Sequence, residues 1–207
     1  MKAIVFYCAV ALISIYATCN KRIDCRQNIY SFESFYKAYP TSDSIQVNDT
    51  VYFELNTPIQ LKDLTTNQTI DYSGAENFGP SIQFISLSAG DSLKTGATPA
   101  AEDFDNVLFR GISIKSDAPD LVKGFRCIEE NGEYKFLVGI IPRKKGLFAI
   151  GLSDAAGVYL KKNTCDKAGF SLTFKNTNQH LYLYEQSRPG YTPSGYEREH
   201  LYCFKVY

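Results

Sequence analysis

Few residues of this 207-residue chain have the types and spacings that catalysis requires. The segment Gly151-Leu152-Ser153-Asp154-Ala155 has part of a nucleophile-elbow pattern, but alanine stands where the pattern needs a second glycine. A nucleophilic serine or cysteine usually needs a histidine base. The two histidines, His180 and His200, belong to no catalytic motif. We therefore predict that the chain has no catalytic residues and is not an enzyme.

Metal ligands are equally sparse. The cysteines of the body have no C-x2-4-C spacing of the kind that holds zinc, and only two histidines accompany them. Glu102, Asp103 and Asp105 form an acidic cluster whose carboxylates could bind calcium. The competing interpretation is a solvated helical turn, in which acids favour the N-terminal end. We predict neither a metal nor a cofactor.

Fifteen tyrosines and no tryptophan give the chain aromatic surface for two different uses. Tyrosine forms strands well and fills sandwich cores, which is the use we expect for most of them. Near the C-terminus, tyrosines gather around a predicted helix and the loop that follows it. Pro189 and Pro193 restrict the backbone conformation of this loop. We predict a contact surface for a protein or a glycan there, formed by Tyr182, Tyr184, Tyr191 and Tyr196.

The first nineteen residues predict export. Lys2 precedes an apolar run from Ala3 to Ala17, which matches the core of a secretory signal and is shorter than the roughly 20 residues of a membrane span. Tyr16-Ala17-Thr18 before Cys19 resembles a loose bacterial lipobox, which implies that Cys19 is acylated and anchors the chain in membrane lipid. Cleavage near Ala17 without acylation, or an uncleaved anchor, stays open. We divide the chain into a signal peptide (1–18), a tether (19–27) and one domain (28–207).

Cysteine usage supports an oxidising compartment. Of six cysteines, Cys8 lies in the leader and Cys19 at its end, which leaves four in the body. Four cysteines form two disulfides in three possible pairings, and the sequence does not choose between them. Each disulfide would add about 2–4 kcal/mol to stability. The predicted disulfide residues are Cys25, Cys127, Cys165 and Cys203.

The charge balance excludes one class of partner. The chain has 22 basic and 22 acidic residues, and removing the leader removes one lysine and no acid. A nearly neutral body lacks the basic face that nucleic acid requires. We predict no nucleic-acid partner.

Alternating apolar and polar residues indicate strands through most of the body. Between residues 50 and 56, for example, Val51, Phe53 and Leu55 share one face and the residues between them share the other. Short strands without repeated βαβ units predict a mainly β fold, an antiparallel β-sandwich of immunoglobulin-like or related type with one or two short helices. The expected strands include 28–36, 44–47, 50–56, 107–115, 125–130, 133–141, 146–152, 170–174 and 201–207.

Two local patterns predict connections. Asn131-Gly132 favours a tight hairpin, and we expect residues 125–152 to form a three-stranded meander whose middle strand, 133–141, lies centrally in a sheet because both its faces are apolar. Asn176 is a good helix cap, and Pro189-Gly190 would end that helix near Arg188. Two helical turns are expected between Pro99 and Phe104.

The leader ending in Cys19, the β-rich body with spaced cysteines, and the stretches Asn178-Gln179-His180-Leu181 and Tyr202-Cys203-Phe204-Lys205-Val206 resemble Bacteroidetes-type envelope lipoproteins. This resemblance implies an envelope location and a fold but no activity. The acidic run common after the lipidated cysteine of surface-displayed members is replaced by Asn20-Lys21-Arg22. We therefore expect a periplasm-facing anchor, with surface display left open.

The same resemblance implies modification. Asp43-Ser44-Ile45, Asp49-Thr50-Val51 and Asp91-Ser92-Leu93 look like the Asp-Ser/Thr-apolar motif for O-glycosylation of exported Bacteroidetes proteins. The implied acceptors are Ser44, Thr50 and Ser92. Aspartate and serine are also ordinary turn residues.

We thus expect a membrane-anchored, disulfide-braced, non-enzymatic domain that binds another envelope component or has a structural role. One alternative is a glycan-binding accessory module of a nutrient uptake system, and a more distant one is a hydrolase with an unrecognised site. A flat apolar patch would favour a protein partner, and a concave pocket with tyrosines would favour a glycan. A histidine-paired nucleophile would favour the hydrolase.

Overall fold

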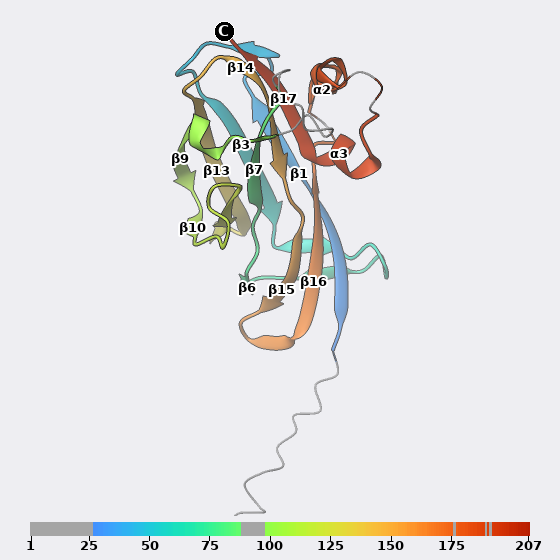
Figure 1. Ribbon diagram of the computed structural model, residues 1–207. Coiled ribbons are helices and arrows are strands. Elements are labelled where there is room, and N and C mark those ends of the chain that lie inside the picture. Colours follow the sequence, from blue (N-terminus) through green and yellow to red (C-terminus); the bar gives the residue numbers. More distant parts are fainter. Residues whose placement is uncertain (1–26, 88–97, 176, 189, 191) are drawn as a thin grey trace, which may run out of the picture.

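The computed structural model describes residues 27–87, 98–175, 177–188, 190 and 192–207 (Figure 1). In these ranges two large curled sheets pack against each other, and two short helices lie beside one of them. The predicted β-sandwich with one or two short helices is confirmed.

The first large sheet has the strand order β12-β13-β3-β1-β16-β15-β6, and β9 also pairs with β13. β1 and β16 run parallel, with Ile29 opposite Lys167, while the other neighbouring pairs of this sheet are antiparallel. The strand bounds are β1 (Ile29–Tyr39), β3 (Val51–Pro58), β6 (Ala75–Glu76), β9 (Phe104–Arg110), β12 (Ile128–Glu130), β13 (Glu133–Pro142), β15 (Ala155–Leu160) and β16 (Asn163–Thr173).

The second large sheet has the order β10-β11-β7-β14-β17-β2, and β8 pairs with β7. Its bounds are β2 (Ser44–Ile45), β7 (Ser81–Ser86), β8 (Thr98–Pro99), β10 (Ile112–Ile114), β11 (Val122–Arg126), β14 (Gly146–Leu152) and β17 (Leu201–Val206). The remaining elements are the hairpin β4 (Gln60–Lys62) and β5 (Thr69–Asp71), the 3-10 turn η1 (Ala101–Asp103), α2 (Leu181–Ser187) and α3 (Gly195–His200). Neither of the two α-helices in the described ranges has the length and hydrophobicity that a transmembrane helix needs.

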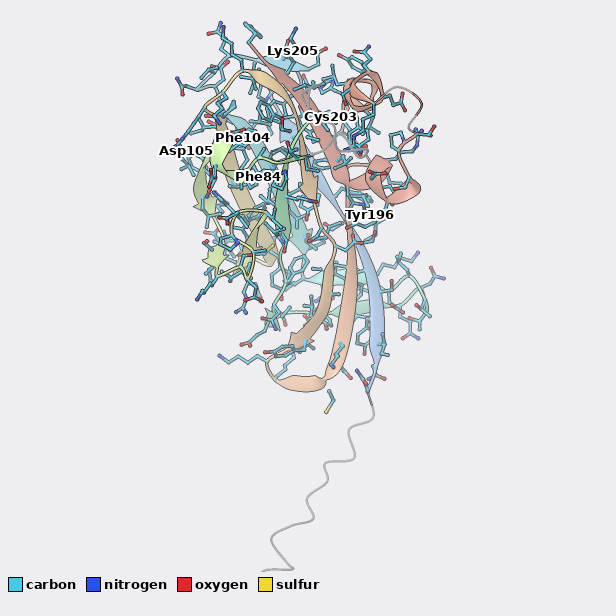
Figure 2. The ribbon with its side chains drawn as sticks, in the orientation of Figure 1. Phe84, Phe104, Asp105, Tyr196, Cys203 and Lys205 are labelled. Carbon is cyan, nitrogen blue, oxygen red and sulfur yellow. The ribbon has the colours of Figure 1, made fainter. Side chains whose placement is uncertain are left out.

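Aromatic rings fill the space between the two sheets. Phe53 of the first sheet meets Tyr202 of the second edge to face, with ring centroids 5.4 Å apart. The ring of Phe104 packs on that of Phe148 with centroids 4.9 Å apart and on that of Phe84 with centroids 5.3 Å apart. Figure 2 labels Phe84 and Phe104, which lie close together. Such pairs add about 0.5–1.5 kcal/mol each beyond their buried area. The alternating apolar residues predicted for the inner face of β3 are in this core.

Four tyrosines are fully buried in this core, and each hydroxyl has a backbone partner. Tyr36 donates to the carbonyl of Ser153 at 3.1 Å, Tyr72 to Val158 at 2.9 Å, Tyr134 to Tyr72 at 2.6 Å, and Tyr202 to Pro40 at 3.1 Å. An unpaired buried hydroxyl would cost about 1–3 kcal/mol, so these hydrogen bonds let tyrosine occupy core positions.

The Asn131-Gly132 hairpin is confirmed, because both residues have positive φ and β12 pairs with β13. The predicted third strand of the meander is wrong, since β14 pairs with β7 and β17 in the opposite sheet. The chain crosses from one sheet to the other after Pro142, which puts Phe148 and Ile150 into the shared core.

Three further expectations are corrected. The single strand expected over 107–115 is divided at Gly111, where φ is +120°, into β9 and β10 of different sheets. The two helical turns expected before Phe104 are one 3-10 turn. The C-terminal helix begins later than expected, at Leu181 after the left-handed residue His180, and a second helix follows it.

Gly79 lies in close contact with the backbone of residues 125–127. A Cβ there would be 2.4 Å from the Phe125 carbonyl oxygen and 2.6 Å from the Arg126 Cα. Backbone hydrogen bonds on either side, from Phe125 to Pro80 and from Cys127 to Phe78, prevent this backbone from moving away.

We predict that Gly79→Ala destabilises the fold by at least about 2 kcal/mol, because the methyl group must displace paired backbone atoms. Gly169→Ala is the matched control in β16, since a Cβ there meets nothing within 4 Å. Urea unfolding of the two variants measures the difference, and equal midpoints would show that the close approach at Gly79 is not restrictive.

Candidate functional site

The two helices cover part of the outer face of the second sheet. Leu183 and Tyr184 of α2 pack on Leu201 and Cys203 of β17 and on Ala149 of β14, which makes a second small core. Figure 1 shows both helices beside β17, on the side of the sandwich away from β9 and β10. The helices therefore form a wall beside the uncovered strands of this sheet.

A groove with a volume of about 340 Å³ lies between that wall and the strands. Gln83 of β7 and Gly151 of β14 contribute to the strand side, while Tyr184, Tyr196 and His200 line the helix side. The structure thus brings together two of the four predicted contact tyrosines.

Tyr196 and His200 stack on each other at one side of the groove. Their ring centroids are 3.9 Å apart and their planes differ by 14°. His200 is 3% exposed and Tyr196 is 56% exposed, so a buried imidazole supports one face of a tyrosine that is more than half exposed. Figure 2 shows Tyr196 on the helix side of the molecule. Burial, followed by the charge of Asp154, raises the pKa of the Tyr196 phenol.

Both nitrogens of His200 have acceptor partners. Nδ1 lies 2.8 Å from the Tyr196 carbonyl oxygen, and Nε2 lies 2.9 Å from Asp154 Oδ1. The same carboxylate oxygen accepts a hydrogen bond from the Leu172 N–H at 2.8 Å. The ring is therefore fixed from both sides.

Ser153 also lines the groove, directly before Asp154. Its hydroxyl oxygen accepts a hydrogen bond from the Ser81 N–H at 3.0 Å. Because His200 uses both its nitrogens elsewhere, it is not placed as a base for this hydroxyl. The spatial proximity of Ser153, Asp154 and His200 is thus a structural contact in this arrangement and does not form a catalytic triad.

Glu197 is the acidic side chain of the groove wall, and it is occupied by hydrogen bonds. Ser194 donates to its Oε2 through the backbone at 2.8 Å and through the hydroxyl at 2.9 Å, which completes a capping box for α3. Tyr184 donates to its Oε1 at 2.7 Å, and Arg188 donates to the Tyr184 hydroxyl at 2.6 Å. This network connects α2 to α3 and positions Tyr184.

Tyr182 lies apart from the groove. It is 44% exposed and donates to the Asp43 carboxylate, and this bond lowers the pKa of Asp43. Tyr191 lies outside the described residues. Near Tyr182, burial lowers the pKa of His180, whose ring meets Tyr202 edge to face at 5.6 Å.

The disulfide prediction is wrong for two residues, because Cys127 and Cys203 are free thiols. Cys203 faces the small core beneath α2, whereas Cys127 packs at the border of the main core, so the two belong to different clusters. Burial raises the pKa of each thiol to about 12. Cys165 is disulfide-bonded, and Cys25 and Cys19 lie outside the described residues.

The remaining sequence candidates are placed as follows. Asp103 forms an ion pair with Lys144 and Asp105 with Arg143, and the second pair lowers the pKa of Asp105. Across the described ranges, no three His, Cys, Asp or Glu side chains gather as a metal site. The implied glycosylation acceptors Ser44 and Thr50 are partly exposed, and Ser92 lies outside the described residues.

No family model and no curated protein matches the chain. Among solved structures, a non-cellulosomal cohesin from the archaeon Archaeoglobus fulgidus has 10% identity and a TM-score of 0.27, and the match covers 74% of this chain and 97% of that one. The type I cohesin–dockerin complex Coh-OlpA-Doc918 from Clostridium thermocellum has 10% identity and a TM-score of 0.22, with 67% and 99% covered. Likenesses this distant carry no argument about function.

We predict that Glu197→Ala lowers the free energy of unfolding by about 1–2 kcal/mol, because Ser194 loses its capping-box partner and Tyr184 loses its acceptor. Glu199→Ala, an exposed acid of the same helix, should change stability little. Urea unfolding compares the two variants, and similar losses would contradict the role given to Glu197.

We predict that Cys127 and Cys203 resist alkylation in the folded chain at pH 9, where an ordinary thiol with a pKa of about 8.5 is mostly ionised. Their raised pKa values keep them protonated and inert. Unfolding without a reductant should expose both to iodoacetamide, while Cys165 should react only after reduction. Peptide mass spectrometry locates the label, and rapid labelling of either thiol in the folded chain would contradict its burial.

Proposed function

We propose that the chain is a non-enzymatic binding domain, presented to a partner protein of the cell envelope by an exported, lipid-anchored polypeptide. The observation that carries the proposal is an uncovered aromatic surface on the first sheet. We call it the aromatic face and define it by Tyr39, Tyr52, Val107 and Phe109.

The aromatic face crosses adjacent strands. Tyr39 of β1 stacks on Tyr52 of β3 with ring centroids 5.1 Å apart, and Tyr52 contacts Phe109 of β9 at 5.8 Å. The rings of Tyr52 and Phe109 lie over Gly139 of β13, where a Cβ would be 3.4 and 3.2 Å from them. Gly139 also pairs with Val107, so the four side chains form one continuous surface.

The exposure of this face favours a partner. Tyr39 is 37%, Val107 44% and Phe109 54% exposed, and no helix of the described chain covers them. Contiguous apolar surface on a soluble domain marks interaction sites. Aromatic residues are also enriched at the centres of protein interfaces.

The arrangement of the rings suits a protein partner. Tyr39 and Tyr52 stack on each other with planes 18° apart, and Tyr52 also contacts Phe109, so the rings form one cluster across three strands. A protein surface can pack against the ring edges and the neighbouring side chains together.

The geometry of the first strand suits an anchored chain. From its first to its last residue, β1 has ten steps of about 3.3 Å each and so spans roughly 33 Å, and its first residue, Ile29, lies shortly after the predicted tether. Tyr39 ends the same strand, so the aromatic face lies at the end far from the proposed anchor at Cys19. Of the four cysteines predicted to form disulfides, Cys25 is the partner we propose for Cys165, because Asn28 donates to Asp166 at 3.0 Å.

Photo-crosslinking in the native host tests the proposed partner. We predict that p-benzoylphenylalanine at position 109 gives a discrete protein adduct, and that the same group at Lys162, in the exposed β15–β16 turn, does not. Adding Val107→Asp should reduce the adduct at least about tenfold, since a buried unpaired charge opposes docking.

Mass spectrometry of the adduct identifies the partner as a protein, and immunoblotting confirms equal amounts of each variant. Equal adducts at positions 109 and 162, or an adduct indifferent to Val107→Asp, would overturn the proposal.

A further inference from the structure

The groove beside α3 has features of a binding site that the aromatic face lacks. Its aromatic ring belongs to Tyr196, a residue that is 56% exposed, and His200 stacks on one of the ring's faces. The negative face of an aromatic ring attracts the slightly positive C–H groups of a sugar ring. An exposed, supported ring of this kind is suited to stacking against a saccharide.

The ring is held in place before any ligand arrives. The His200 ring beneath it lies within hydrogen-bond distance of the Tyr196 carbonyl oxygen and of the Asp154 carboxylate. That carboxylate also accepts a hydrogen bond from the backbone N–H of Leu172 in β16. The capping box of α3 orders the helix that carries both rings. A preordered contact loses little conformational entropy on binding, which favours affinity.

Neutral polar groups also line the groove. The Gln83 side chain is exposed and offers both an amide donor and an acceptor. The Ser153 hydroxyl accepts a hydrogen bond from the Ser81 N–H, so its own proton can be donated to a ligand. Groups of this type form hydrogen bonds with sugar hydroxyls.

The charges in the groove argue for a neutral ligand. None of the described residues that line it is lysine or arginine, and both nitrogens of His200 already have partners, so an anionic ligand would find no available cationic side chain. Glu197 is occupied by Ser194 and Tyr184. The volume of about 340 Å³ is near the lower end of the roughly 300–1,000 Å³ of small-molecule sites, which suits a short saccharide segment.

We propose that this groove binds a neutral saccharide, with one sugar ring stacked on Tyr196 and its hydroxyls bonded by Gln83 and Ser153. The site is separate from the aromatic face, on the opposite sheet, and adds a second binding activity to the proposed function. It requires no covalent step.

The absence of tryptophan allows a direct test. Tyr196→Trp keeps an aromatic platform and makes it the sole tryptophan of the chain, so its fluorescence reports on this position alone. The full chain in detergent is titrated with neutral oligosaccharides derived from starch, β-glucan, xylan, mannan, galactan and chitin, and with anionic oligogalacturonate. We expect a saturable change in emission with at least one neutral oligosaccharide and none with oligogalacturonate.

Tyr182→Trp is the matched control, because Tyr182 is an exposed tyrosine of α2 outside the groove. It should give no saturable change. Calorimetry with the oligosaccharide found should show affinity weakened about threefold to tenfold by Tyr196→Ala, and weakened also by Gln83→Ala, while Tyr196→Trp retains binding.

The proposal is overturned if no neutral oligosaccharide changes the Tyr196→Trp emission, if Tyr182→Trp responds equally, or if Tyr196→Ala binds as tightly as the natural chain. Preference for oligogalacturonate would overturn the neutral-ligand assignment. Val107→Asp should leave saccharide binding unchanged, so failure here and failure of the crosslinking experiment are distinguishable.

Discussion

The structure depends on the interlocking of aromatic rings between the two sheets. Phe53, Tyr202 and Phe174 contact one another across the sandwich, and Phe170 packs against Phe78 at 4.2 Å. Rings are large and rigid, so the two sheets can approach in few ways. Buried tyrosine hydroxyls add a directional constraint, since each must reach a particular carbonyl oxygen. This core determines which strand faces remain outward and available for contacts.

The outward faces of the two sheets differ in what covers them. Leu183 and Tyr184 bring the helices onto the second sheet, where their packing leaves a groove instead of a flat surface. The first sheet has no helix over Tyr52 and Phe109 in the described chain, and its aromatic residues remain accessible. The domain therefore has a groove beside α3 and an exposed aromatic face, and these are the two surfaces for which we propose different kinds of ligand.

Local patterns in the sequence predict the strands better than their partners. Alternation in β3 and the Asn131-Gly132 turn are short-range signals, and both elements form as expected. The alternation of apolar residues in β14 predicts a strand but does not predict which sheet it joins. That choice depends on tertiary packing, which places β14 between β7 and β17. The groove shows the same limit. The tyrosine-rich segment is visible in the sequence, whereas the contact between His200 and Asp154 joins residues 46 positions apart. Counting cysteines likewise could not place Cys127 and Cys203 in separate clusters.

The parallel pairing of β1 with β16 has a consequence for the order of synthesis. Paired residues such as Phe32 and Phe170 are separated by most of the chain. The C-terminal part of β1 pairs with the nearby β3, but its N-terminal part, from Ile29 to Phe35, must wait until nearly all the polypeptide has been made. Contacts this distant form slowly because the intervening loop must first be closed. The sandwich can therefore close around this parallel pair only after β16, near the end of the chain, has been synthesised.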